Sequence, residues 1–255
     1  MNPSNRLSLY QFEPRQIILP DPNDAYFIRA KEAYINDKND NHNPEWYIQA
    51  KIRDNKDGYF DFSKSMIDIG ACYGVYTWCL PFAFSYMFEP NKEYFAYMNA
   101  NALLHDRIWS TIMYNLAVSD YDGFIQFDGF NSGYYANPNG NTWADFKCEN
   151  VRCVRLDDNV ELFQNIGFIK IDIEGQEPAA LRGMEEVIRK NSYPPILFES
   201  WPAPKPGIFY ESRYTETQEE YEKRIDELIN ILIDVLGYTI IWGYGDDDTH
   251  LAIHQ

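Results

Sequence analysis

Positive charge is scarce in this chain. Lys and Arg total 22 against 39 Asp and Glu, so the formal net charge is −17 over 255 residues. DNA or RNA is therefore not expected as a partner, and neither is an anionic membrane surface, because both carry negative charge. Neutral substrates such as sugars or small alcohols are compatible with the imbalance, and so is a cationic cofactor. Simple solubility explains the charge equally well.

Long apolar runs and cysteines are scarce too. No apolar stretch approaches the ~20 residues of a membrane-spanning helix, and the first residues lack the apolar core of a secretory signal. The four cysteines form no C-x-x-C pair and are too few for a disulfide scaffold in a chain of this length; they are Cys72, Cys79, Cys148 and Cys153. Reduced thiols and a cytoplasmic location are expected.

The composition is nevertheless that of a folded protein, with 45% hydrophobic and 16% aromatic residues. Residues 1–60 are polar and interrupted by prolines, which predicts an N-terminal extension packed on the core, with one short helix near 44–53. Residues 61–255 are expected to form the main domain.

From residue 65 onward, strand-like and helix-like segments alternate. Strands are predicted at 65–69, 85–89, 111–118, 124–128, 150–155, 168–172, 195–199, 238–242 and 250–254, and helices at 74–81, 91–104, 177–190 and 216–236. This alternation predicts an α/β fold, with a mostly parallel sheet covered on both faces. The last two strands resemble a hairpin, which predicts an antiparallel last strand at or near one edge of the sheet.

The segment SMIDIGACYGVYTW, residues 65–78, predicts a nucleotide-binding half-fold. Its apolar run ends in Asp68, turns through Gly70 and Ala71, and resumes after Gly74. A second apolar run ends in an acid, Glu89, where it can accept both hydroxyls of a ribose. The glycines are expected to let the backbone approach the ligand.

The spacing of this turn lacks the third glycine of a dinucleotide site, G-x-G-x-x-G. Asp68 would repel a phosphate but can pair with an ammonium group. A ribosylated ligand with a cationic amino-acid tail therefore fits better, and S-adenosylmethionine (SAM) is such a ligand. An oxidoreductase that binds NAD or a nucleotide sugar is the enzymatic alternative, and a buried strand with an ordinary glycine turn is the structural one.

A second informative segment is IKIDIEGQE, residues 169–177. Lys170, Asp172 and Glu174 share one face of an extended strand, because side chains alternate along it. Four acids follow or end predicted strands, and the carboxyl ends of parallel strands form the ligand crevice of such folds; they are Asp68, Glu89, Asp172 and Glu199.

These ionisable groups admit three interpretations. In the first, Asp172 handles a proton of the acceptor while Lys170 holds a carboxylate ionised or orients a hydroxyl, supported by Glu199. In the second, Asp172, Glu174 and Glu199 hold a divalent cation, which stays possible but is not the prediction. In the third, Lys170 and Asp172 form a structural pair, and Glu174 or Glu177 is an acid at a helix N-terminus.

The histidines suggest less. His105 is expected to cap the C-terminus of the helix before it, and His42 or His250 is a weaker alternative for a general base. Because no His-x-x-x-His pair or mixed Cys/His cluster occurs, no metal site is predicted. The aromatic segment at 129–143 is expected to be an irregular loop, which either stacks on a sugar or purine or is simply pinned to the surface.

Taken together, these segments resemble the FkbM family of SAM-dependent methyltransferases. The matching segments occur in the family's order: DIGACYGVYT at 68–77, FEPN at 88–91, Asn101, NLAVSD at 115–120, RLDD at 155–158, IKIDIEGQE at 169–177, LRGMEEVI at 181–188 and PILFES at 195–200. The resemblance implies a Rossmann-like class I methyltransferase fold, with seven strands of which the last is antiparallel. It also implies O-methylation of a hydroxyl, on a sugar, a glycan or a small molecule. A non-catalytic SAM-binding interaction protein is a further alternative.

The resemblance also assigns the cofactor residues. It implies that the turn cradles the methionine part of SAM, through Asp68, Gly70, Ala71, Cys72 and Gly74. Glu89 would bind the ribose hydroxyls, together with Pro90 and Asn91 of the same segment, and Ala117 and Ser119 would lie beside the adenine. Cys72 departs from the family pattern, because many relatives carry Asn there. On this basis Asp172 is the expected base or orienting group, with Lys170, Glu174 and Glu199 around it.

Overall fold

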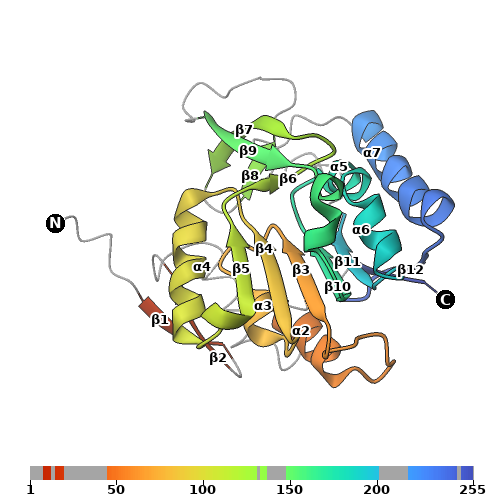
Figure 1. The fold of residues 1–255 in the computed structure, drawn as a ribbon. Helices are drawn as coiled ribbons and strands as arrows, with labels where there is room; N and C mark the ends of the chain where they lie inside the picture. The colour runs from red at the N-terminus through yellow and green to blue at the C-terminus, as the bar shows by residue number, and fades with distance from the viewer. Residues whose placement is uncertain are drawn as a thin grey trace.

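The computed structural model describes residues 8–12, 15–19, 45–130, 133–136, 148–200, 218–245 and 248–254. A seven-stranded sheet forms the centre, in the order β12-β13-β11-β10-β3-β4-β5 (Figure 1). Its strands are β3 (Ser65–Ile69), β4 (Phe84–Phe88), β5 (Thr111–Tyr114), β10 (Ile166–Ile171), β11 (Ile196–Glu199), β12 (Thr239–Ile241) and β13 (Thr249–Ile253).

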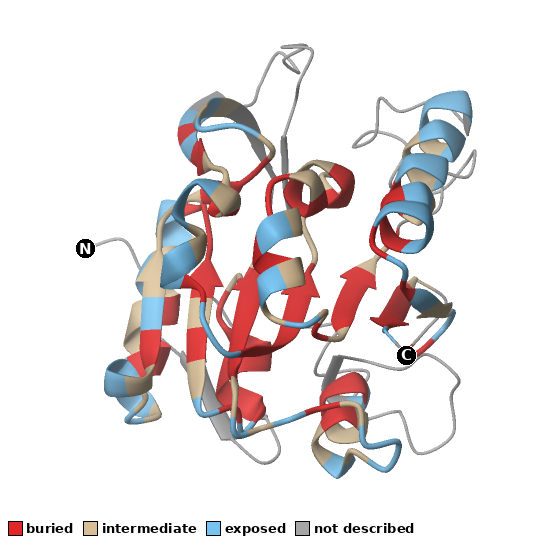
Figure 2. Ribbon diagram, turned by 45° about the vertical axis from the view of Figure 1, so that its right-hand side comes forward, coloured by how far each residue is buried: buried red, intermediate tan, exposed pale blue. Residues whose placement is uncertain are grey.

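The pairing of these strands confirms the predicted fold class. β5, β4, β3, β10 and β11 pair in parallel, whereas β13 is antiparallel to both β11 and β12. The last strand thus lies second from one edge. Continuous apolar runs predicted the central strands, because a parallel strand is buried on both faces, and β3 and β10 are buried along their whole length (Figure 2).

Helices cover the two faces of the sheet. One face carries α2 (Glu45–Asp54), α3 (Val75–Cys79) and α4 (Lys92–Leu104), and the other carries α5 (Glu177–Arg182), α6 (Glu185–Lys190) and α7 (Gln218–Asn230), as Figure 1 shows. Ile48 and Ile52 of α2 pack into the core beside Met66, Phe168 and Leu251 of the strands. The division into an extension and a domain stays a prediction.

A second, four-stranded sheet lies beyond the carboxyl ends of the parallel strands (Figure 1). Its order is β6-β9-β7-β8, with β6 (Ala117–Val118), β7 (Gly123–Phe130), β8 (Gly133–Ala136) and β9 (Cys148–Val154). The prediction of one strand over 111–118 is wrong, because the chain leaves the main sheet at Asn115, whose side-chain amide donates to the carbonyls of Glu89 and Pro90. The segment at 129–143 is not all irregular, since β8 holds Tyr134 and Tyr135; Trp143 lies outside the described residues.

Two predicted helices also differ from those observed. The helix expected at 177–190 is interrupted at Gly183, where a Cβ atom would lie 1.9 Å from the carbonyl oxygen of Ser119. The helix expected at 216–236 is described from Gln218 onward and ends in a π-helical turn, Ile231–Val235. 3₁₀ turns cover Ile108–Ser110 and Leu156–Leu162.

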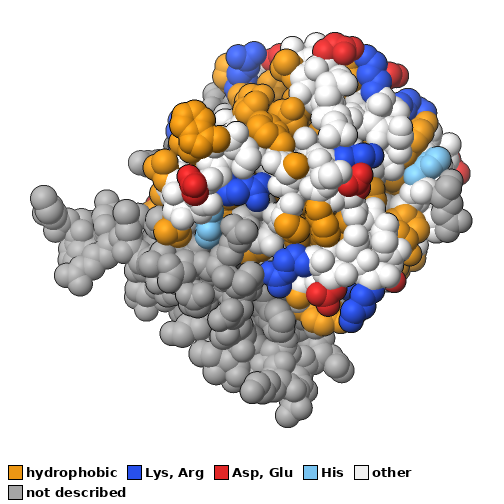
Figure 3. Space-filling model, turned by 60° about the horizontal axis from the view of Figure 1, so that its bottom comes forward, with side chains coloured by type: hydrophobic (Ala, Val, Ile, Leu, Met, Phe, Trp, Pro, Cys, Tyr) orange, Lys and Arg blue, Asp and Glu red, His pale blue; other side chains and the backbone are white. Residues whose placement is uncertain are grey.

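The N-terminal part also contains an unpredicted hairpin, β1 (Ser8–Phe12) and β2 (Arg15–Leu19), whose second strand contacts α4 and α3. The fold presents a mixed surface on the side away from the second sheet. There, basic and acidic side chains of the described residues are interspersed among apolar ones and are not sorted by sign (Figure 3). Within the described ranges, no helix is both long and apolar enough to cross a membrane.

Candidate functional site

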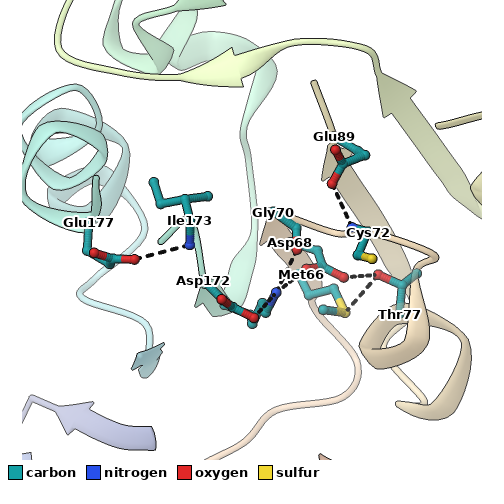
Figure 4. A network of polar contacts seen from close by, with 10 residues as sticks. Met66, Asp68, Gly70, Cys72, Thr77, Glu89, Asp172, Ile173 and Glu177 are labelled. Atoms are coloured by element: carbon teal, nitrogen blue, oxygen red, sulfur yellow. Dashed lines mark hydrogen bonds and ion pairs between the residues drawn. The ribbon is translucent and has the colours of Figure 1, made fainter. Parts of the chain in front are cut away.

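Lys170 links the two informative segments. It lies on β10 directly beside Asp68 of β3, since these residues are partners in the parallel register. Its ammonium donates to the carbonyl oxygen of Gly70 at 2.7 Å and lies 3.2 Å from Asp172 Oδ2 and 3.8 Å from Asp68 Oδ1. Figure 4 shows Asp68 and Asp172 on either side of this contact. The expected meeting of the strand ends at one rim is therefore observed for these residues.

Asp68 is almost fully buried and held from two sides. Thr77 of α3 donates its hydroxyl to Asp68 Oδ2 at 2.8 Å, and Lys170 supplies the nearby positive charge. Burial nevertheless dominates and raises the pKa of Asp68, because desolvation disfavours the charged form. The carboxylate expected to face the ammonium group of a ligand thus already has an ammonium group of the protein beside it.

Asp172 is the more accessible carboxylate, with 32% of its side chain exposed. Burial opposes its ionisation, but the positive charge of Lys170 and the hydrogen bonds that Asp172 accepts from the Glu199 carboxyl group and the Lys170 ammonium outweigh that cost and lower the pKa of Asp172. Glu199 comes from the end of β11, the neighbouring strand. The structure therefore brings together three of the four predicted catalytic residues, Lys170, Asp172 and Glu199. The carboxylate that Lys170 favours in its ionised form is that of Asp172.

Glu89 follows β4 on the opposite side of the turn at 70–74. Its two carboxylate oxygens accept backbone N–H groups at 2.8 Å, Oε2 from Cys72 and Oε1 from Asn91. Burial raises the pKa of Glu89 to about 7, although these two hydrogen bonds favour the charged form. Each oxygen keeps a further lone pair, so the carboxylate can still accept two hydroxyl donors.

The glycines of the turn make room for the protein itself. A Cβ on Gly70 would lie 1.9 Å from the carbonyl oxygen of Asp172, and one on Gly74 would lie 2.3 Å from Nε1 of Trp78. Both glycines also have positive φ, 74° and 81°. These glycines are expected from the sequence to let a ligand approach the backbone. In the structure, the lack of a side chain at Gly70 and Gly74 first of all allows the end of β10 and α3 to pack against the turn.

The other residues of the turn divide between core and rim. Ala71 is buried in an apolar cluster with Trp78 and Met87, so only its backbone can serve a ligand. Cys72 is half-buried and adopts the left-handed conformation, φ 51°, where Asn is tolerated better than other side chains. This conformation provides a physical reason for the Asn expected from relatives.

The remaining predicted cofactor residues serve the fold in identifiable ways. Asn91 is the N-cap of α4, and its side chain accepts N–H groups of Glu93 and Tyr94. Ala117 packs in the apolar cluster of the second sheet, and the backbone of Ser119 lies against Gly183. The cofactor roles of these residues stay predictions.

Glu174 and Glu177 belong to the turn after Asp172. Glu174 has a positive φ of 57°, and Gly175, which follows it, has 95°. Glu177 is buried at the first residue of α5, and its Oε1 accepts the N–H of Ile173 (Figure 4). The same oxygen accepts the N–H of Gly175. This part of the third interpretation is confirmed for Glu177: it is an acid at a helix N-terminus that holds the preceding turn.

His250 is not placed to act as a base. Its Nδ1 accepts the backbone N–H of Gly243 at 3.0 Å, so Nε2 carries the proton and donates to Ser200 Oγ at 2.7 Å. His250 also pairs with Phe198 in the antiparallel register, which places it on the face opposite Glu199. His105 is the C-cap of α4, as predicted, and His42 lies outside the described residues.

The structure lends no support to the divalent-cation alternative. The described residues contain no group of three His, Cys, Asp or Glu side chains that could hold a metal ion. The ammonium of Lys170 already supplies positive charge between Asp68 and Asp172.

Comparisons with known proteins agree with the fold and the motifs. The profile of the methyltransferase FkbM domain matches residues 68–240. Methyltransferase FkbM from Methylobacillus flagellatus KT has a similar crystal structure, with a TM-score of 0.53 and 17% identity, over 90% of this chain and 55% of that one. This chain therefore spans about half the length of that protein.

A putative caffeoyl-CoA O-methyltransferase from Staphylococcus aureus matches more weakly. Its TM-score is 0.47 and its identity is 14%, over 91% of this chain and 93% of that chain. No curated protein matches the chain.

Proposed function

Because the chain belongs to the FkbM family of methyltransferases, we propose that it is a SAM-dependent O-methyltransferase acting on a hydroxyl of a sugar, a glycan or a small molecule. One observation carries the proposal. Two acids flank the 70–74 turn at the carboxyl edge of the sheet. Glu89 is buried and can accept the hydroxyls of a ribose, and Asp172 is partly exposed and can accept the proton of an acceptor hydroxyl.

The residues around Glu89 fit a nucleoside. Its carboxylate lies at the end of β4 and is fixed by two backbone N–H groups, one of which belongs to Cys72 of the glycine turn. A fixed, buried carboxylate with free lone pairs favours a pair of vicinal hydroxyls, because each hydroxyl can donate to one oxygen. SAM, when bound there, supplies a methyl group on a sulfonium, which is reactive without further activation.

The chain's own task is then to place an acceptor hydroxyl and to remove its proton. Asp172 suits this role, because Lys170 keeps it ionised while part of its side chain stays exposed. General-base assistance of this kind contributes about 10²–10⁴-fold to a rate. Glu199, hydrogen-bonded to Asp172, is placed to orient the same carboxylate.

The proposal is tested by binding and turnover in sequence. Calorimetric titration with S-adenosylhomocysteine (SAH), SAM and NAD comes first, and a screen of neutral hydroxylic acceptors for SAH release follows. We expect micromolar binding of both adenosyl ligands. Asp172→Asn should retain SAH binding while kcat falls by about 10²-fold or more. Binding of NAD alone would contradict the proposal, and full turnover by Asp172→Asn would contradict the role assigned to Asp172.

A further inference from the structure

The peptide segment that carries Asp172 is under conformational strain. Glu174 adopts a positive φ of 57°, which is unfavourable for a residue with a side chain, and Gly175 follows with a φ of 95°. Such backbone persists only where surrounding contacts over-determine it. The contacts that do so here identify residues that control the position of Asp172.

Glu177 supplies the first of these contacts. Its side chain is 1% exposed, and its Oε1 accepts the N–H of Ile173 at 3.1 Å and the N–H of Gly175 at 3.2 Å. One carboxylate oxygen therefore clamps the peptide groups immediately after Asp172. An acid that only complemented the helix dipole would not need to be buried against these two amides.

Arg224 of α7 supplies the second contact. Its Nη1 lies 4.0 Å from Glu177 Oε2, and a Cβ on Gly175 would lie 3.3 Å from its guanidinium carbon. The guanidinium thus packs against the strained peptide, where a Cβ would make a tight contact with it and where the φ of 95° itself favours glycine. α5 and α7 are further joined because Arg182 pairs with Asp120 and also with Glu227 of α7.

We propose that Glu177 and Arg224 are positioning residues, which set the place of the Asp172 carboxylate through the 173–175 turn. The inference rests on the methyl transfer proposed above. It assigns α7 a role in the reaction although neither side chain belongs to the predicted catalytic set. A displacement of about 1 Å at a reacting group is enough to lower a rate by about 10²-fold.

The expected result is a division between turnover and cofactor binding. Glu177→Ala should lower kcat by about 10- to 100-fold while the KM for SAM changes less than about threefold, because Glu89 and the 70–74 turn stay in place. Glu177→Gln keeps an oxygen for the two amides but turns an NH₂ group toward Arg224, so it should recover most of kcat. Arg224→Lys keeps a positive charge near Glu177 Oε2 and should therefore retain more of kcat than Arg224→Gln.

Glu185→Ala is the matched control. Glu185 is also an acid in the first turn of a helix, α6, and pairs with Arg189 at 3.7 Å, but it clamps no turn of the site. It should leave kcat unchanged. Rates are normalised to the number of SAH sites found by calorimetry, so that unfolded protein does not count as a slow enzyme.

Each outcome decides the question. If kcat per SAH site is unchanged in Glu177→Ala, or in Arg224→Gln should the alanine variant not fold, the residues only stabilise the protein and the inference is wrong. If kcat and the KM for SAM change in parallel, the turn serves the cofactor and the inference is also wrong. If the wild type binds SAH and no variant behaves as expected, only this inference fails. A wild type that binds no SAH overturns the proposed function as well.

Discussion

Glu89 makes cofactor affinity depend on pH near neutrality. Burial raises the pKa of Glu89 to about 7, so the free protein carries a mixture of protonated and ionised acid at physiological pH. Two donating hydroxyls of a ligand would favour the ionised form and lower the pKa of Glu89 in the complex. Affinity for SAH should therefore reach a plateau above pH 7 and fall as the pH drops below it.

The size of the effect follows from the titration of one group. With a pKa near 7, the ionised fraction falls from about nine-tenths at pH 8 to about one-tenth at pH 6, so the Kd for SAH should rise about tenfold. Titrations at constant ionic strength, in buffers of different ionisation enthalpy, should also show proton release on binding near pH 7. In Glu89→Gln, binding should be weaker and independent of pH.

The same group affects the stability of the free protein in the opposite sense. Its pKa is raised above the ordinary 4.5, so the folded state binds the proton more tightly, and stability is lost as the pH rises from 4.5 through 7. The full shift corresponds to about 3 kcal/mol. In denaturant unfolding, Glu89→Gln should thus gain stability relative to wild type between pH 5 and pH 8. A wild-type Kd for SAH that is equal at pH 6 and pH 8 would refute the reasoning.

Three further substitutions test the turn and its charges. Cys72→Asn should raise stability by about 0.5–1 kcal/mol, seen as a higher Tm, because Asn tolerates φ 51°, and SAH binding should persist because the backbone N–H at position 72 still holds Glu89. Gly74→Ala should cost about 2 kcal/mol or more in urea unfolding, since its Cβ would meet Trp78. Lys170→Met should cost about 3–5 kcal/mol, because it leaves a buried charge unpaired, and the cost should shrink as the pH is lowered, because burial raises the pKa of Asp68 and protonation removes that charge; a loss that does not depend on pH would contradict this.

The central sheet could be predicted from the sequence because its signal is local. β3 and β10 are largely apolar runs that end in an acid or a turn, and their alternation with helices predicts a mostly parallel sheet. The same locality predicted the meeting of Asp68, Lys170 and Asp172, since the ends of neighbouring parallel strands share one rim.

Features that depend on tertiary contacts could not be predicted in this way. Nothing local marks Asn115 as the residue where the chain leaves one sheet for another, because its amide acts through carbonyls 25 and 26 residues earlier. From the sequence, Glu177 is expected only as an acid at a helix start. Its hydrogen bonds to the turn are local, but the guanidinium of Arg224 that faces its other oxygen comes from α7, far along the chain. Gly70 correctly predicted a turn, but the atom that a side chain at this position would strike is the carbonyl oxygen of Asp172, which follows β10.

Lys170 joins the two halves of the site in a way that changes how mutations must be interpreted. One ammonium serves the carbonyl of Gly70 and the carboxylates of Asp68 and Asp172. When either carboxylate is replaced by an amide, the ammonium of Lys170 interacts with the remaining carboxylate alone, so the pKa of that remaining acid should fall further. The effects of Asp68→Asn and Asp172→Asn on stability and on SAH binding should therefore not add. A double-mutant cycle between these two positions measures the coupling, and strict additivity would mean that the shared ammonium does not connect cofactor side and acceptor side.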